Sequence, residues 1–457
     1  MTVLSDMTVL SDSRGVPHLV ERPSDMEFVE EAIVQLVSMK LDHERCRPSD
    51  GSTPPVAVQL MLAVDLLCAM ERTAVMAASE ICASLTGAGP TEPRTRAMLS
   101  AIGFWAAGDL AAARNGFQSV VDAHPGDAVS IYTVHMLDFY IGDAPHMLAS
   151  IAQSVPAFAP DDPVTGYLYG LHGFALEENG LIETAIERSR LALELHPDDI
   201  YAMHAMVHCL YEKGRHAEGA RYIQEYMRGR DGSTPMRIHI WWHYALFELY
   251  EGNIQDVLAC YRIGIRRKTS LRSPEDLDAV TLLWRLALVR PSLDLSAYWQ
   301  ALFQDWKPYL EENWYLFNDF HAYLTYCQVG EYGHADALLE AVRARGKEVS
   351  EEMVDVFLGF RSFTTGDYAD SAARLARSFH ASFPMGGSNA QRDVIELTGI
   401  EAALRSQDGE IAQRFRESGR IFRHQGPVLQ EYEARLAELC TSAHRENREH
   451  HTQGVSK

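Results

Sequence analysis

The sequence predicts an all-α fold, a superhelix of about nine to ten helical hairpins with a concave pocket. Two observations predict it. Turn glycines recur along the chain at steps close to 34 residues, and the Asn-Gly turns between alternating apolar runs that mark β-hairpins are missing. With 47% hydrophobic and 23% charged residues, the composition is that of a folded globular chain.

The clearest repeats begin at Gly108 and Gly180. In both, alanine follows five residues later and proline seventeen residues later. Successive turn glycines are 34, 38, 34 and 38 residues apart as far as Gly252, and the later steps are 78, 36 and 43 residues. The step of 78 fits two units, with Arg290 near the missing turn. The turn glycines are Gly108, Gly142, Gly180, Gly214, Gly252, Gly330, Gly366 and Gly409.

A step of about 34 residues is that of the tetratricopeptide repeat, in which each unit is a pair of antiparallel helices. Each hairpin has an apolar face that it cannot bury alone, so neighbouring hairpins stack. The sequence therefore predicts a tetratricopeptide-like α-solenoid over residues 56–442. Before it, residues 1–55 are expected to form an N-terminal extension and a first helix near 26–42, and residues 443–457 a flexible polar tail. The doubled MTVLSD at the start is left out of the fold prediction.

The charge of the chain suggests which partners to exclude. A net charge of −22 repels phosphate backbones and anionic lipids, so we expect neither nucleic acid nor a membrane as partner. No apolar stretch approaches the roughly 18 residues of a spanning helix, and no signal peptide is recognised. The seven cysteines form no CxxC pair, which fits a reduced, cytoplasmic location.

Five histidines are predicted to share one face of the first helices. At 100° per residue, and with each helix indexed to its turn glycine, they fall within one 100° arc. Because first helices of this repeat line the concave surface, we expect these side chains to converge there, with Tyr201, Trp242 and Trp284 as aromatic walls. The five are His204, His208, His239, His243 and His321.

The two histidine pairs at i, i+4 spacing are candidate metal ligands. His204 with His208, and His239 with His243, each place two imidazoles one turn apart. Neutral imidazole favours a transition metal such as Zn or Fe over calcium or magnesium. The alternatives are acid–base or substrate-binding histidines without a metal, or histidines hydrogen-bonded within the fold. No nucleotide-cofactor motif occurs.

Two further segments are candidates. In LFNDFH, Asn318 and Asp319 precede His321, where a carboxylate could orient the imidazole or either residue could cap the helix. In GGSNAQRD, Ser388 and Gln391 fit a capping box, and the alternative is an anion site.

A catalytic role is considered for His204, His208, His239, His243, His321 and Asp319. Substrate binding is considered for His135, Asp278, Trp242, Trp284, Asn318, Asn389, Gln391, Arg392 and Asp393, although the position of His135 outside the arc favours a buried core histidine. Arg392 would hold an anionic substrate.

Seven segments carry a family resemblance: TVHMLDFYIG (133–142), GLHGFALEENGLIETA (170–185), YAMHAMVHCLYEKGRHAEG (201–219), IHIWWHYALFELYEG (238–252), DAVTLLWRL (278–286), LFNDFH (316–321) and GGSNAQRDV (386–394). Together they resemble the tetratricopeptide repeat protein 38 family over roughly residues 60–440. The resemblance implies a helical solenoid and gives no reaction. The matching positions are His135, His204, His208, His239, His243, Asp278, Asn318, Asp319, His321 and Asn389 to Asp393.

These residues support two functional hypotheses. The first is a ligand-binding and catalytic solenoid whose histidine-rich pocket takes a small polar or anionic substrate, with or without a metal. The second is a non-enzymatic scaffold that binds a partner protein or peptide on its concave face. The sequence leaves open whether the protein is an enzyme at all.

Overall fold

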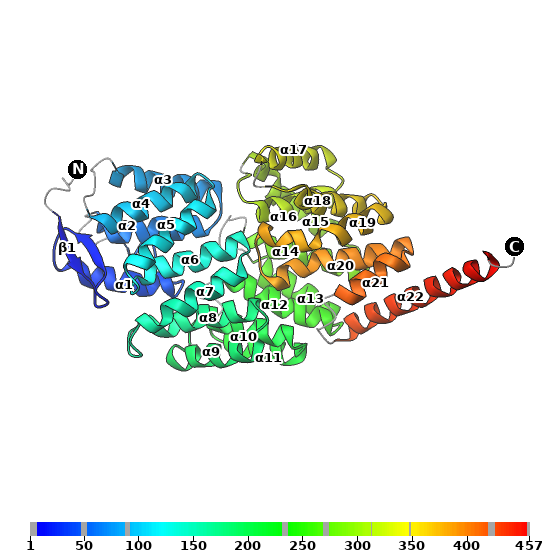
Figure 1. Cartoon of the computed structure of the whole chain (residues 1–457), viewed down its shortest axis with the longest axis horizontal. Helices are drawn as coiled ribbons and strands as arrows, with labels where there is room; N and C mark the ends of the chain where they lie inside the picture. The colour runs from blue at the N-terminus through cyan, green and yellow to red at the C-terminus, as the bar shows by residue number, and fades with distance from the viewer. Residues whose placement is uncertain are drawn as a thin grey trace. The chain divides into compact units, whose positions relative to one another are not determined.

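The computed structural model of the chain describes residues 7–46, 53–86, 92–230, 236–267, 274–311, 313–346, 349–418 and 426–454. Within this part the chain is almost entirely helical, with helices α1 to α22 and two short strands (Figure 1). The contacts divide it into two compact units, Met1–Cys209 and Leu210–Lys457.

The first unit begins with a hairpin of two strands and continues as helical pairs. Its elements are β1 (Thr8–Ser11), β2 (Pro17–Val20), α1 (Asp25–Val37), α2 (Val56–Cys68), α3 (Arg72–Thr86), α4 (Pro93–Ala106), α5 (Leu110–Ala123), α6 (Ala128–Ile141), α7 (Ala144–Ser154), α8 (Thr165–Glu178), α9 (Ile182–Leu195) and most of α10 (Ile200–Glu212). Consecutive helices such as α4 with α5 and α8 with α9 pack against each other.

The second unit consists of helices in the part that the structure describes. They are α11 (His216–Met227), α12 (Arg237–Tyr250), α13 (Ile254–Cys260), α14 (Pro274–Val289), α15 (Ser296–Trp306), α16 (Leu316–Gln328), α17 (Tyr332–Arg343), α18 (Glu351–Thr364), α19 (Tyr368–Ser378), α20 (Asn389–Ser406), α21 (Gly409–Ser418) and α22 (Pro427–Gly454). The predicted tetratricopeptide-like solenoid is confirmed. The backbone of α22 is helical as far as Gly454, well into the expected polar tail.

The turns between paired helices lie where the repeat predicts them. The glycines from Gly108 to Gly366 in the predicted series all have positive φ, for example 88° at Gly108 and 83° at Gly366. The missing turn is also where we expected it, because α14 ends at Val289 and the chain turns at Arg290 before α15. One turn residue was assigned wrongly. Gly409 is the first residue of α21, and Gln407 takes the left-handed position with φ 57°.

The prediction that strands are absent was wrong at the N-terminus. Strands β1 and β2 pair antiparallel, with Thr8 opposite Val20. The second copy of the doubled MTVLSD thus belongs to the fold, whereas its first copy and residues 47–52 of the expected N-terminal extension lie outside the described residues. Tertiary contacts explain why a strand this short forms: β2 packs on α2 and α4, and the pair is further fixed by buried ion pairs.

The buried ion pairs beside the strands involve two arginines. Arg94 from α4 binds Asp127 through two nitrogens, at 2.7 and 3.1 Å. Its guanidinium also contacts His18 of β2, whose other ring nitrogen lies 3.1 Å from Asp12. Arg14, in the turn, reaches Asp162. Truncating one partner of such a pair would leave a buried charge uncompensated, so the hairpin is held firmly to the helices.

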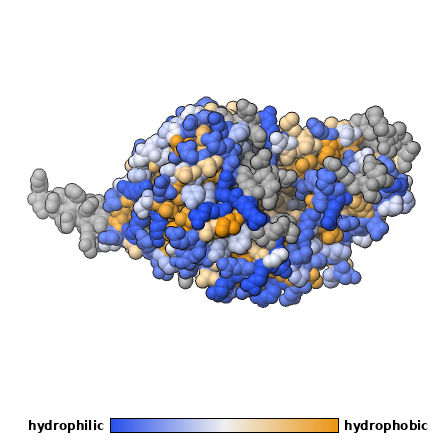
Figure 2. Space-filling model, turned by 180° about the vertical axis from the view of Figure 1, so that it is seen from behind, coloured by the Kyte–Doolittle hydropathy of each residue, from blue (hydrophilic) through white to orange (hydrophobic). Residues whose placement is uncertain are grey.

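The surface shows polar and apolar residues intermixed on the face drawn in Figure 2. Among the described residues, large exposed hydrophobic side chains are spread over several helices, for example Met76, Phe104 and Leu191. Scattered apolar residues are ordinary on a protein surface. None of the described helices is both long enough and apolar enough to cross a bilayer.

We predict that Gly366→Ala lowers the free energy of unfolding by about 1 kcal/mol, because a side chain at φ 83° is strained. No atom lies within 4 Å of the added methyl group, so backbone strain is the whole effect. Gly333→Ala is the matched control, since the space there is equally open but the residue is helical; it should leave stability unchanged or raise it. Urea unfolding measures both, and equal effects of the two changes would contradict the assignment.

Candidate functional site

The histidine pair on α10 is anchored by carboxylates of the preceding hairpin. The rings of His204 and His208 lie 4.4 Å apart. Nδ1 of His208 lies 3.2 Å from Glu177 and 3.8 Å from Glu178, at the end of α8, and all three side chains are buried. The two carboxylates thus lie on the Nδ1 side of the His208 imidazole, within the distance of an ion pair.

The pair on α12 has the same arrangement. Nδ1 of His239 lies 2.9 Å from the carboxylate of Asp278 on α14, and Nε2 of His239 lies 3.2 Å from Nε2 of His243. The indole of Trp242 stacks on His239, with ring centres 5.2 Å apart and planes 16° from parallel. The carboxylate thus fixes which nitrogen of His239 is protonated, and the stacking fixes the plane of its ring.

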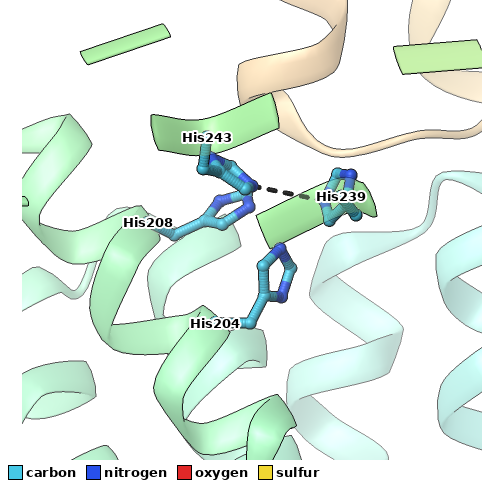
Figure 3. A group of neighbouring side chains, drawn as sticks. All are labelled: His204, His208, His239 and His243. Atoms are coloured by element: carbon cyan, nitrogen blue, oxygen red, sulfur yellow. Dashed lines mark hydrogen bonds between the residues drawn. The ribbon is translucent and has the colours of Figure 1, made fainter. Parts of the chain in front are cut away.

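The four histidines of α10 and α12 form one group. Each offers a ring nitrogen, and these nitrogens all lie within 4.8 Å of one another. Figure 3 shows the four rings turned towards one another. His208 also belongs to a second such group, with Glu177 and Glu178. His239 is the most accessible of the four, with 17% of its side chain exposed, and the other three are buried.

The group has dimensions that suit a transition metal. Two nitrogens bound at about 2.0–2.1 Å to a tetrahedral ion are roughly 3.3 Å apart, close to the 3.2 Å between His239 and His243. Carboxylates on the far nitrogens of His208 and His239 are the usual outer partners of metal-bound imidazoles. Since all four ligand atoms are neutral nitrogens, the donor set favours zinc, iron, copper or nickel over calcium.

The fifth predicted histidine lies elsewhere. His321, on α16, is buried and outside the group of four, and its Nδ1 donates to the carbonyl of Phe317 over 2.7 Å. Asp319 does not orient it, because residues two apart on a helix face different ways. Asp319 instead pairs with Arg345, and burial raises the pKa of Asp319 to about 6 although Arg345 opposes the rise. Neither Asn318 nor Asp319 caps α16, which begins after Tyr315.

The loop before α20 is built as a helix start. The capping box is confirmed: Ser388 Oγ accepts from the amide of Gln391, and the Gln391 side chain accepts from the amide of Ser388. Arg392 donates to the carbonyls of Gly386 and Gly387 and to the side chain of Asn389. Its guanidinium is therefore engaged within its own loop.

A small cavity joins this loop to His321. It is about 10 Å³ in volume and is lined by Phe317, Phe320, His321, Ser382, Met385, Gly386, Gln391, Arg392, Val394 and Ile395. That volume is about one water molecule. The structure thus brings His321, Gln391 and Arg392 together, but around a space too small for an organic substrate.

The remaining predicted residues are core residues with defined partners. His135 Nε2 lies 3.0 Å from the hydroxyl of Tyr201, and burial lowers the pKa of His135 to about 3, so the ring is neutral. Trp284 is buried and donates to Thr398 over 2.9 Å. Asp393 accepts the hydroxyl of Tyr211, also over 2.9 Å.

Sequence reasoning named Asp278 but missed Glu177 and Glu178, the carboxylates beside the His208 imidazole. Glu177 and Glu178 stand just before the turn at Gly180, one repeat before His208. Indexing acidic residues to the same turn glycines could have found them. Arg285 was also missed, although it lies in a segment that carries the family resemblance, because an arginine inside an apolar helix gives no sign of its partner.

No protein-family model matches the chain. Among solved structures, a human IFIT1 dimer with m7Gppp-AAAA is 12% identical, with a TM-score of 0.45, and the match covers 90% of this chain and 94% of that one. A human IFIT1 dimer with PPP-AAAA is also 12% identical, with a TM-score of 0.44 and the same coverage. A Chs5–Chs6 exomer complex is 10% identical, with a TM-score of 0.24, over 92% of this chain and 72% of that one. The fold assignment rests on the helices themselves.

The prediction that excluded nucleic acid as a partner was wrong. The similar IFIT1 structures contain m7Gppp-AAAA or PPP-AAAA. Net charge describes a whole chain, whereas a binding site depends on local charge. The acidic composition is therefore no ground for the exclusion.

Buried histidines predict a loss of stability in acid. Burial lowers the pKa of His135 to about 3 and that of His321 to about 4, against an ordinary value of 6.5. Only the unfolded chain takes up these protons, so the free energy of unfolding should fall below about pH 6.5, by up to about 1.4 kcal/mol per pH unit for each histidine. Burial lowers the pKa of His172 to about 4 as well, which adds to the loss, whereas burial raises the pKa of Asp199 to about 7 and of Asp319 to about 6, which opposes it between about pH 4 and 7. Urea unfolding at pH 7, 6 and 5 measures the slope. In a His135→Phe variant the free energy of unfolding should depend less steeply on pH. An unchanged slope would show that His135 does not cause the loss of stability.

Proposed function

We propose that the protein binds a divalent transition metal, zinc or iron, through the imidazoles of His204, His208, His239 and His243. One observation supports this most strongly. In each pair, one imidazole is anchored at Nδ1 by a buried carboxylate, so that its Nε2 is left as the donor atom. Two such anchored rings, from different helices, belong to one group of nitrogens within 4.8 Å.

The outer carboxylates would orient these ligands for a metal. Asp278 accepts the Nδ1 proton of His239, and Glu177 lies 3.2 Å from Nδ1 of His208. A carboxylate at Nδ1 orients the ring and raises the basicity of the opposite nitrogen. They also bring negative charge close to a cation held by neutral ligands. A bound metal would polarise a ligand oxygen or lower the pKa of a bound water molecule.

The metal site would serve a small polar or anionic ligand, in a ligand-binding and catalytic solenoid. The partly exposed ring of His239 is the side from which a ligand can approach. We assign the chain to the tetratricopeptide repeat protein 38 family as part of this proposal, and a cytoplasmic location with it. All seven cysteines are free thiols, which is in keeping with a reduced compartment.

Elemental analysis of protein purified without a histidine tag tests the metal. We expect about one zinc or iron per chain, and little metal in the His208→Ala and His243→Ala variants because each loses a ligand atom. His146→Ala is the matched control. His146 also pairs with an aspartate, Asp143 at 2.7 Å, but it lies at the surface with 68% of its side chain exposed. Equal metal content in all four proteins would defeat the proposal.

The outer carboxylates give a second prediction. Glu177→Gln and Asp278→Asn keep the size of the side chain but remove the charge that orients the imidazole. We expect each to weaken metal binding about 10–100-fold without abolishing it. Competition with a chromophoric chelator measures the dissociation constants, with Asp143→Asn as the surface control. Affinities unchanged in both variants would show that these carboxylates do not support a metal.

A further inference from the structure

Arg285 is a buried cation in the second unit that has no counter-ion of its own. It lies on α14 with no exposed surface. Its terminal nitrogens donate to main-chain carbonyls, those of Ala390 and Gln391 at 2.7 and 3.2 Å and, more weakly, that of Thr281 at 3.4 Å. In the described residues no carboxylate forms an ion pair with it, neither Asp278 nor Asp393.

One donor of Arg285 remains without an acceptor. Its Nε–H is buried and forms no hydrogen bond within the part of the chain that the structure describes. An unsatisfied buried donor is costly, and more so when it carries charge. Arginine cannot lose its proton to relieve that cost. An anionic oxygen at this point would satisfy both the charge and the donor.

Trp242 supplies a second donor of the same kind. Its indole Nε1–H is also buried and without an acceptor among the described residues. The guanidinium carbon of Arg285 lies 5.5 Å from the centre of the Trp242 ring, so the two side chains are neighbours. Both groups are hydrogen-bond donors and neither can accept, so a single acceptor could satisfy the two N–H groups together.

The same indole connects this position to the proposed metal site. Trp242 stacks on His239, whose Nδ1 is held by Asp278. Asp278 and Arg285 are seven residues apart on α14, which places them on the same face, two turns or about 10 Å apart along the helix. The guanidinium of Arg285 and the imidazole of His239 are thus both neighbours of the Trp242 indole.

We propose that Arg285 and Trp242 bind an anionic oxygen of the ligand of this protein, through Arg285 Nε–H and Trp242 Nε1–H. The ligand class is a small organic anion, with a carboxylate or a phosphate as the recognised group. This inference deepens the proposed function, since the anion would lie beside the metal. It also replaces Arg392, the arginine that the sequence suggested, because Arg392 is engaged by its own loop.

Anion titration of the full-length chain tests the proposal. Acetate, succinate and phosphate are added at constant ionic strength to cobalt-loaded and to metal-free protein. The thermal midpoint and the visible absorption of cobalt are recorded. We expect at least one anion to raise the thermal midpoint of both forms and to change the cobalt spectrum. A response to acetate or succinate but not to phosphate identifies a carboxylate as the recognised group, and the reverse result identifies a phosphate.

Two substitutions locate the binding. Arg285→Gln removes the charge and the donor, and Trp242→Phe keeps an aromatic ring but removes the N–H. Each substitution should weaken, by about tenfold or more, the binding of the anion that raises the thermal midpoint. This is the effect expected for the loss of a charge-assisted or buried hydrogen bond. Trp105→Phe is the control. Its indole is equally buried and lacks an acceptor, but no guanidinium faces its ring in the described part of the chain.

The possible outcomes separate this inference from the metal proposal. If cobalt binds and no anion acts, or if both variants respond like the unsubstituted protein, the anion site is refuted and the metal site stands. If cobalt does not bind but metal-free protein responds through Arg285 and Trp242, only the metal proposal fails. Circular dichroism would show whether Arg285→Gln folds. If it does not, the anion response of Trp242→Phe compared with that of Trp105→Phe decides whether the anion site exists.

Discussion

The fold depends on a left-handed residue between the two helices of most hairpins. Positive φ reverses the chain within a few residues, and glycine adopts it without strain. Because the turn recurs at a nearly constant step, a residue at a given distance before it takes a similar place on each first helix. His208 stands six residues before Gly214, and His243 nine before Gly252. The turn thus fixes where along each helix an imidazole is presented.

Buried carboxylates then determine how these imidazoles are oriented and which ring nitrogen each has available. A buried histidine without a partner would be costly, and a protonated one more so. Pairing Nδ1 with Glu177 or Asp278 removes the cost at one nitrogen and leaves the other as a base. The same residue types pair at the surface as His146 with Asp143, where competition from water leaves the pair with little effect. Burial makes the difference between the two arrangements.

Features that depend on periodicity are predicted well from the sequence. These are the hairpins, their turns and even the turn without glycine at Arg290, because each depends on spacing alone. Prediction fails where a residue depends on distant contacts. Gln407 replaces Gly409 because the preceding helix ends two residues earlier than the pattern requires. The β1–β2 hairpin forms because Arg94, some 75 residues away, closes a buried ion pair beside it.

The histidine site illustrates the same limit. The helical angle that selects His208 also selects His321, yet His321 lies beside a water-sized cavity and outside the group. The helical angle of a residue gives the direction in which its side chain leaves the helix axis. A site also requires that neighbouring helices present their side chains at the same height along their axes. Glu177 and Asp278 are far from their partners in sequence, so their pairing with His208 and His239 follows from the packing of neighbouring hairpins.

Charge gives the most specific argument about the ligand. A divalent metal bound by four neutral imidazoles keeps its full charge, and the Glu177 and Asp278 carboxylates behind the rings offset it in part. Arg285 adds a further buried positive charge, which donates to main-chain carbonyls. A cation stays buried at this cost when something negative joins it in the working state of the protein. A neutral ligand would leave the charge of Arg285 uncompensated, whereas an anion would not, so the proposed site would favour an acid as its ligand.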